Sequence, residues 1–198
     1  MITDINQLDF NKKYTYADYL TWQFQERVEL LKGRIFKMAA PSRQHQEISL
    51  MLERHIDRFM LDNNSRCKLY HAPFDVRLPL PTHRIKGDKV STVVQPDICV
   101  ICDLSKLDNR GCNGAPDVVI EILSPGNGRR ERKEKYDLYE SAGVQEYWVV
   151  QPNESFVIRY NLDEKGQYIG SRLYTEDDVM ESKVLEGFQI DINQIFDK

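Results

Sequence analysis

The feature of the sequence that most constrains the fold is a strand–helix–strand pattern in its second half. Two apolar runs rich in β-branched residues, APDVVIEIL (115–123) and EYWVVQP (146–152), flank the charged segment RRERKEKYDLYESAG. This segment has helical spacing of its apolar residues and ends at Gly143, a common helix terminator. Strands joined by a helix normally lie parallel in one sheet. The pattern therefore predicts an α/β protein with a central sheet flanked by helices.

The other predicted elements are short helices and strands that extend or cover this sheet. The first half begins with a helix over about 15–25, opened by a Thr15–Asp18 capping box, and a β-hairpin of RVELLKG and RIFKMA that turns at Gly33. A helix from Ser42 to about 62, the strands KLYHA and FDVRLPL, a polar loop with Pro79, Pro81 and Gly87, and a strand over 93–102 follow. After the strand–helix–strand unit come a hairpin of FVIRYNL and YIGSRLY and a strand GFQID before a terminal helical turn.

Length and composition indicate one globular domain. The chain has 198 residues, of which 41% are hydrophobic and 29% charged, and this balance excludes intrinsically disordered and fibrous classes. We expect residues 1–198 to form a single domain, with 1–13 as a flexible segment. No apolar run approaches the roughly 20 residues of a membrane span. The start MITDINQLDF lacks the features of a signal peptide, so we expect a cytoplasmic protein.

The four cysteines, Cys67, Cys99, Cys102 and Cys112, are predicted to be buried, reduced thiols. Cys99 and Cys102 resemble a CxxC motif, but both lie in the predicted strand 93–102. Residues i and i+3 of a strand point to opposite faces, so these two thiols cannot share a metal ion or a disulfide. Reduced cysteines also suit the expected compartment.

Two acidic residues lie where an apolar strand would not otherwise place them. Glu121 shares a strand face with Val119 and Leu123, and Asp97 shares one with Cys99 and Ile101. Burying an unpaired carboxylate costs several kcal/mol, so each acid needs a cation, a proton or a set of donors. Either acid alone could be a structural residue at a strand end. Together, on adjacent strands, they indicate a divalent metal site.

Lys135 is the third member of this candidate site. Helical periodicity places it on one face with Leu138, Tyr139 and Ala142, and the apolar members of that face must pack against the sheet. Its charged neighbours have the ordinary interpretation of a solvated helix face. Two acids and a lysine are the residues of metal-dependent phosphodiester cleavage, in which carboxylates hold Mg²⁺ and the lysine positions water or stabilises developing charge.

The segment Pro96-Asp97 … Glu121-Ile122-Leu123 resembles the PD-(D/E)XK nuclease superfamily, although Leu123 occupies the position of the motif lysine. A longer series of motifs is similar to the Uma-two family of restriction-endonuclease-like proteins and covers about residues 14–196. The motifs, in order, are VELLKG, PSRQHQ, APFDVRL, VVQPDICVICD, GAPDVVIEILSP, EKYDLY and AGVQEYWVVQP.

This resemblance implies a restriction-endonuclease-like fold: a mixed central sheet flanked by helices, with extra β-hairpins. It also implies that the motif lysine has moved to the following helix, at Lys135. Glu29 matches an acid that completes the metal site, although it could equally be a solvated strand residue. His45 matches a histidine that either contacts phosphate or caps a carbonyl. Glu131 and Gln151 depart from the aspartates common at their positions.

Two functions follow as hypotheses. The first is a Mg²⁺- or Mn²⁺-dependent DNA endonuclease in which Asp97, Glu121, Glu29 and the Ile122 carbonyl bind metal and Lys135 assists the attacking water. The second is a catalytically silent nucleic-acid- or protein-interaction module that kept the fold, since a fold alone does not decide function.

Contact with DNA would need a local basic patch, because the formal net charge is −4. The densest basic stretch consists of Arg129, Arg130, Arg132 and Lys133, and it is the predicted DNA-binding surface, with His45 as a further contact. We expect a homodimer, since cutting both strands needs two sites and small proteins commonly pair through twofold symmetry.

Overall fold

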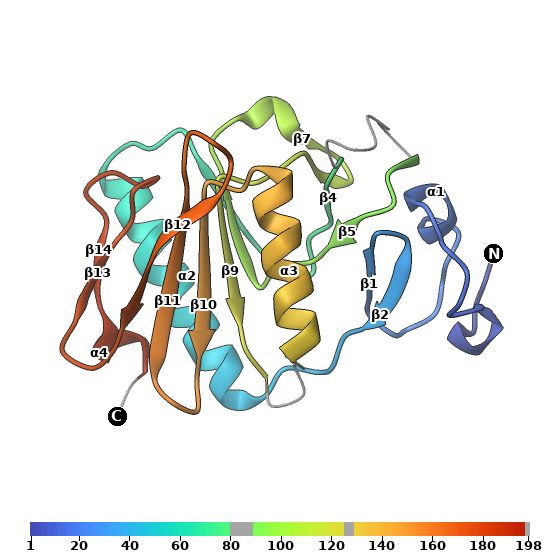
Figure 1. The fold of residues 1–198 in the computed structure, drawn as a ribbon, viewed down its shortest axis with the longest axis horizontal. Helices are drawn as coiled ribbons and strands as arrows, with labels where there is room; N and C mark the ends of the chain where they lie inside the picture. Colours follow the sequence, from blue (N-terminus) through green and yellow to red (C-terminus); the bar gives the residue numbers. More distant parts are fainter. Residues whose placement is uncertain (80–88, 125–128, 197–198) are drawn as a thin grey trace.

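The structure, a computed structural model, describes residues 1–79, 89–124 and 129–196; the side chains of 129–131 and 171 are outside that description. The central sheet has the strand order β12-β11-β10-β9-β6-β3 (Figure 1). Its strands are β3 (Lys68–His71), β6 (Ile98–Ile101), β9 (Val118–Ile122), β10 (Glu146–Gln151), β11 (Phe156–Leu162) and β12 (Tyr168–Tyr174). The polar loop predicted around Pro81 and Gly87 falls outside the described residues.

The predicted strand–helix–strand unit is confirmed. β9 and β10 are parallel, with Glu121 opposite Val149, and α3 (Arg129–Ala142) connects them. The remaining neighbours in this sheet, including the predicted hairpin of β11 and β12, are antiparallel. The protein is therefore a mixed α/β structure with a mixed sheet, as expected.

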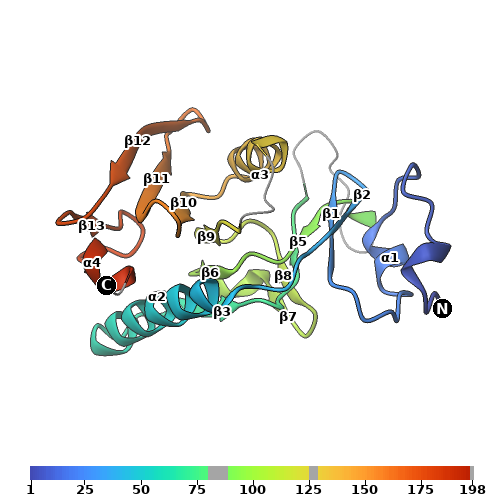
Figure 2. The same ribbon diagram turned by 90° about the horizontal axis from the view of Figure 1, so that it is seen from below.

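Two helices cover opposite faces of the central sheet (Figure 2). On one face lies α2 (Arg43–Asp62), whose N-cap is Ser42 as predicted: the Ser42 hydroxyl accepts a hydrogen bond from the His45 N–H. On the other face lies α3. Each face therefore has its own core, because alternate residues of every strand point to opposite sides.

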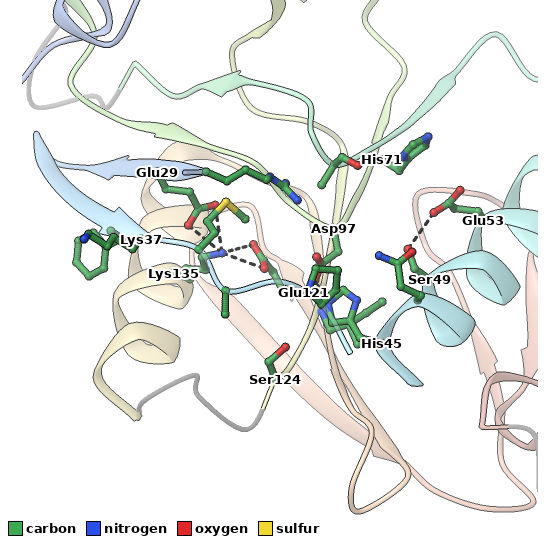
Figure 3. A pocket seen from close by; sticks show the side chains of 18 residues that line it. Glu29, Lys37, His45, Ser49, Glu53, His71, Asp97, Glu121, Ser124 and Lys135 are labelled. Atoms are coloured by element: carbon green, nitrogen blue, oxygen red, sulfur yellow. Dashed lines mark hydrogen bonds and ion pairs between the residues drawn. The ribbon is translucent and has the colours of Figure 1, made fainter. Parts of the chain in front are cut away.

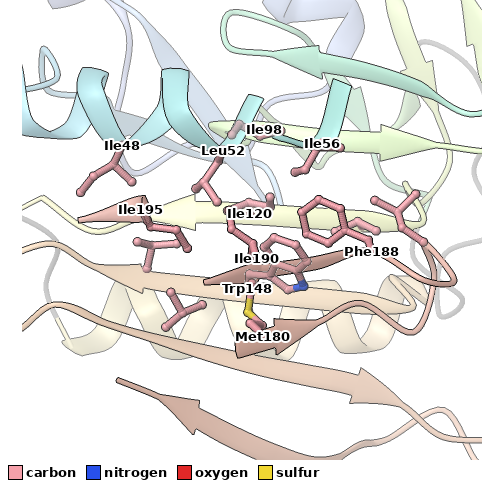
Figure 4. Packing of buried hydrophobic residues seen from close by; sticks show 14 of the residues in the cluster. Ile48, Leu52, Ile56, Ile98, Ile120, Trp148, Met180, Phe188, Ile190 and Ile195 are labelled. Atoms are coloured by element: carbon pink, nitrogen blue, oxygen red, sulfur yellow. The ribbon is translucent and has the colours of Figure 1, made fainter. Parts of the chain in front are cut away.

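The core beneath α2 consists mainly of apolar side chains (Figure 4), and beside them the buried Glu146 carboxylate accepts a hydrogen bond of 2.6 Å from Trp148 Nε1. Ile48, Leu52 and Ile56, spaced four residues apart along α2, pack against Ile120 of β9 and Trp148 of β10. The C-terminal elements close this core: β13 (Val179–Glu181), β14 (Gln189–Asp191) and α4 (Ile192–Ile195) contribute Met180, Ile190 and Ile195.

A second sheet, of order β2-β1-β5-β4-β8-β7, lies beside the first. Its strands are β1 (Val28–Leu31), β2 (Arg34–Lys37), β4 (Val76–Arg77), β5 (Val93–Val94), β7 (Leu107–Asp108) and β8 (Gly111–Asn113), with η4 (Leu104–Lys106) before β7. The predicted hairpin is present as β1 and β2, and Gly33 in its turn has a φ of +84°, which favours glycine.

The N-terminal segment packs against this second sheet. It contains η1 (Ile5–Gln7) and α1 (Tyr16–Tyr19), and Ile5 and Leu8 are buried in an apolar cluster with residues of β1. The Thr15–Asp18 capping box is confirmed, but the helix is one turn long rather than extending to 25. Trp22 explains this end, because it forms a β-bridge with Ile2 and ring contacts with its aromatic neighbours. The segment expected to be flexible is thus packed in the structure.

The single strand predicted over 93–102 is wrong. The chain forms β5 and β6 instead, and these belong to different sheets. Pro96 accounts for the break, since it lacks an N–H and restricts the residue before it. Asp97 consequently lies just before β6, where the two sheets meet.

The prediction of four reduced thiols is also wrong. Cys67 and Cys102 form a disulfide, with a Cα–Cα distance of 4.0 Å. They lie opposite one another because β3 pairs antiparallel with β6, with Lys68 beside Ile101, a pairing that the sequence does not reveal. Cys99 and Cys112 are buried free thiols, and burial raises the pKa of Cys112 to about 11. The exclusion of a Cys99–Cys102 bond is confirmed.

No helix within 1–79, 89–124 and 129–196 is both long and apolar enough to cross a membrane.

Candidate functional site

Three elements distant in sequence bring two acids and a lysine into direct contact (Figure 3). Lys135 Nζ of α3 lies 2.9 and 3.0 Å from the two carboxylate oxygens of Glu121 on β9. The same ammonium group lies 3.2 Å from Glu29 Oε2 and 3.3 Å from Glu29 Oε1, on β1 of the second sheet. All three side chains are at least nine-tenths buried. The structure therefore joins the sheets through a buried ionic cluster.

The local sequence explains why Lys135 points inward. Lys135, Leu138 and Tyr139 lie on one helix face, and the structure buries all three, which confirms the predicted orientation. Tyr139 adds a contact that the sequence analysis did not assign: its hydroxyl donates a hydrogen bond of 2.6 Å to Glu121 Oε1. Glu121 is thus held by an ammonium group and a phenol from successive turns of α3.

Asp97 lies just before β6, beside the same strand, β9. Its Oδ2 accepts hydrogen bonds from the Ile122 N–H at 2.7 Å and from His45 Nε2 at 3.2 Å. His45, in the first turn of α2, is 8% exposed. The structure shows this bond to Asp97, and the two predicted roles of His45, contact with a phosphate and capping of a carbonyl, stay predictions. The predicted ligand role of the Ile122 carbonyl stays a prediction.

The electrostatics of the cluster follow from burial and from unequal numbers of charges. Burial raises the pKa of Glu121 to about 7; Lys135 opposes this rise, whereas Asp97 and Glu29 add to it. Burial lowers the pKa of Lys135, but Glu121 and Glu29 outweigh it and raise that pKa above its usual range. The pKa of His45 is likewise raised, with Asp97 overcoming the effect of burial. Lys135 is charged at neutral pH and pairs with two carboxylates, Glu121 and Glu29.

The cluster lies on the wall of a cavity of about 210 Å³ between the β1–β2 hairpin and the first turns of α2. Glu29, His45, Asp97, Glu121 and Lys135 all line it. The structure therefore brings together in one cavity the side chains predicted to bind metal, Glu29, Asp97 and Glu121, and the predicted catalytic lysine, Lys135.

The chemistry of these residues fits a divalent cation, although their present arrangement is not a finished metal cage. Among the described residues, no three His, Cys, Asp or Glu side chains are placed to share a metal ion. Lys135 occupies both oxygens of Glu121, and Asp97 keeps one oxygen, Oδ1, without a hydrogen-bond partner in the described part of the chain. Carboxylate oxygens are the ligands Mg²⁺ prefers, and three acids facing one lysine leave negative charge to be balanced.

The predicted DNA-binding stretch lies elsewhere on α3. Arg132 and Lys133 are exposed, Lys133 pairs with Asp137 at 3.0 Å, and neither residue lines the cavity. The side chains of Arg129, Arg130 and Glu131 are outside the described part. The helix thus presents Arg132 and Lys133 to solvent and Lys135 to the site.

Two further residues join the site without having been predicted. The Gln95 N–H donates to Glu29 Oε1 at 2.8 Å, and Arg27 donates to the Gln95 side-chain oxygen and lines the cavity. The sequence carried a weak signal for both. Arg27 precedes Glu29 by two positions, as strand neighbours on one face do, and Gln95 precedes Asp97 by two in an apolar run.

Known proteins resemble the chain along nearly its whole length. An uncharacterised protein of Synechocystis sp., slr1290, is 21% identical over 187 residues, which are 91% of this chain and 90% of that protein. A crystal structure described as "a putative nuclease belonging to DUF820" from Anabaena variabilis superposes with a TM-score of 0.71. It is 20% identical and covers 92% of this chain and 97% of its own, which shows a shared fold.

The family comparison is more specific. Residues 16–193 match the family Uma2, described as "Putative restriction endonuclease". The match spans both sheets and every residue of the ionic cluster, and it agrees with the motifs found in the sequence. The chain belongs to the Uma2 (Uma-two) family.

Proposed function

We propose that this protein is a Mg²⁺- or Mn²⁺-dependent endonuclease that hydrolyses phosphodiester bonds of DNA. The observation that carries the proposal is the meeting of Lys135 and Glu121 at 2.9 Å beside Asp97 in one polar cavity. Membership of a family described as "Putative restriction endonuclease" supports it. A restriction-endonuclease-like fold, a PD-(D/E)XK ancestry and a homodimer with two sites belong to the same proposal.

Each residue has a role that its contacts favour. Asp97 and Glu121 would hold the cation, with Glu29 as a further carboxylate. Bound Mg²⁺ would polarise the phosphate and lower the pKa of a coordinated water. Lys135 places a fixed positive charge where negative charge develops on the phosphate. Tyr139 and His45 orient Glu121 and Asp97 through the hydrogen bonds described above.

One observation favours the alternative, a catalytically silent interaction module. Both oxygens of Glu121 already accept hydrogen bonds from Lys135, so the ionic cluster is satisfied as it stands. Calorimetric titration with Mn²⁺ separates the two proposals. The endonuclease predicts binding by the parent and none by Asp97→Asn, whereas equal or absent binding in both proteins favours the module.

Cleavage assays on supercoiled plasmid and single-stranded oligonucleotides test the role of Lys135. Lys135→Ala should lower cleavage by roughly 10²-fold or more, the scale for losing a charge that acts in the transition state. Lys165→Ala, an exposed lysine between β11 and β12 that does not line the cavity, is the control and should cleave like the parent.

The double variant Lys135→Ala/Leu123→Lys tests whether an ammonium group attached to the strand can replace the one on the helix. Leu123 follows Glu121 by two positions, so a lysine there would leave the strand on the same side as Glu121. We expect partial recovery of cleavage. Lys135→Ala cleaving as fast as the parent would contradict the catalytic role, and a parent inactive with every metal would contradict the endonuclease itself.

A further inference from the structure

Arg27 is a cationic side chain that lines the cavity and has no carboxylate partner among the described residues. Its Nε and Nη2 both donate to a single neutral acceptor, Gln95 Oε1, at 3.2 and 2.9 Å. It makes no ion pair with any carboxylate of the described residues. The fork of the guanidinium therefore keeps both N–H groups of Nη1 and one of Nη2 for another acceptor.

The acceptor that holds Arg27 is itself fixed. Gln95 is buried, and its Nε2 donates to Asp75 Oδ1 at 3.0 Å and to the Tyr19 hydroxyl at 3.1 Å. Because these bonds use the amide nitrogen, they orient the amide oxygen toward Arg27. Its backbone N–H binds Glu29 as well. Arg27 is thus anchored by a residue bonded to the N-terminal helix and to the ionic cluster.

Arg27 and its anchor Gln95 each lie two residues before a carboxylate of the site. Arg27 precedes Glu29 by two residues on the extended chain, and its anchor Gln95 precedes Asp97 by two, so the same two segments carry both the acids and the guanidinium. Three acids and one lysine would repel an approaching phosphodiester. A guanidinium at the cavity wall offsets this repulsion, and its planar fork matches two oxygens of a phosphate group.

We propose that Arg27 forms an anion subsite that binds a non-bridging oxygen of a backbone phosphate in a nucleic-acid strand, next to the phosphate that is cut. This inference rests on the proposed function, because it takes the acids as the reacting centre. It places the strand between the β1–β2 hairpin and α2, and not along the exposed basic face of α3.

Fluorescence anisotropy with a labelled single-stranded oligonucleotide, in EDTA so that no cleavage occurs, tests the subsite. Arg27→Gln should weaken binding about 10- to 100-fold, the range for one charge-assisted contact. It should also reduce the slope of log K against log salt by about 0.7. Arg27→Lys keeps the charge without the fork and should lose less. Arg34→Gln, exposed on the same hairpin and away from the cavity, is the control and should match the parent.

The outcomes separate this subsite from the endonuclease proposal. Binding that depends on Arg27 in a protein that never cleaves supports the subsite and contradicts the endonuclease. Cleavage with equal affinity and equal salt slope in the parent, Arg27→Gln and Arg27→Lys contradicts the subsite and leaves the endonuclease standing.

Competition with inorganic phosphate identifies the source of the anion. Millimolar phosphate that fails to displace the oligonucleotide supports recognition of a strand. Phosphate that binds in an Arg27-dependent manner while the oligonucleotide does not bind would overturn the nucleic-acid assignment in favour of a free-phosphate site. Unchanged thermal midpoints of the folded variants exclude loss of structure as the cause.

Discussion

The two faces of the central sheet are made from alternate residues of the same strands, yet they are used differently. Ile120 and Ile122 of β9 point to the α2 face and pack in a core made mainly of apolar side chains. The buried Glu146 carboxylate on that face accepts hydrogen bonds from Trp148 Nε1 and two backbone N–H groups. Glu121, also of β9, points to the α3 face, where it accepts hydrogen bonds from Lys135 and the Tyr139 hydroxyl. The first face gains stability from burial. The second must offset the desolvation of charges with ion pairs and hydrogen bonds.

The two faces should therefore differ in how they tolerate substitutions. A core can absorb a leucine or isoleucine change by repacking, at a cost set by the cavity left behind. An ionic cluster cannot absorb the loss of its cation, because removing Lys135 leaves Glu29 and Glu121 buried without a counter-charge. Three substitutions test this difference between the two faces.

The largest effect on stability is expected from Lys135→Met, which removes the cation shared by Glu29 and Glu121. Breaking a buried ion pair on one side costs about 3–5 kcal/mol of the free energy of unfolding. The loss should shrink as the pH falls, because protonated carboxyls no longer need a counter-charge. Urea unfolding in EDTA between pH 5 and 8 measures it. Lys133→Met, on the solvent side of α3, should stay within about 0.5 kcal/mol of the parent.

The opposite face should respond without any pH dependence. Leu52→Ala deletes a fully buried side chain of α2 and should cost about 2–5 kcal/mol at pH 5 and pH 8 alike. The same urea experiment tests it, and cleavage per folded molecule should be unchanged. A pH-dependent loss in Leu52→Ala would show that the two faces are energetically coupled.

The smallest effect concerns the protonation of Glu121. Its pKa is raised to about 7 in the folded protein from an ordinary value of 4.5, so the folded state holds more protons than the unfolded state between these values. This contribution to stability is present below about pH 4.5 and is lost as the pH rises through about 7.

Glu121→Gln should remove that part of the pH dependence, a change of about 1–3 kcal/mol across the window. Thermal midpoints of the metal-free parent and variant, measured at intervals from pH 4.5 to 8, give the difference directly. Parallel pH profiles for the two proteins would mean that Glu121 titrates as an ordinary carboxyl group. A rise in midpoint on adding Mn²⁺ should occur in the parent alone.

The elements that could be located from the sequence are those that depend on residues close together in the chain. The period of apolar residues located β9, α3 and β10 and made the parallel pairing of the two strands predictable. Ser42 and the Thr15–Asp18 box marked helix starts, because a side-chain oxygen must satisfy the free N–H groups there. The helical period alone also turned Lys135 toward the sheet. These features need only neighbours along the chain.

Contacts between segments far apart in the sequence became visible only in the tertiary structure. The disulfide of Cys67 and Cys102 follows from the register of β3 against β6, and the split at Pro96 follows from two sheets competing for one stretch. The contact of Glu29 with Lys135 and the anchoring of Arg27 by Gln95 join residues 68 to 106 positions apart. Local propensity carries no information about such contacts, because packing of the two sheets against each other creates them.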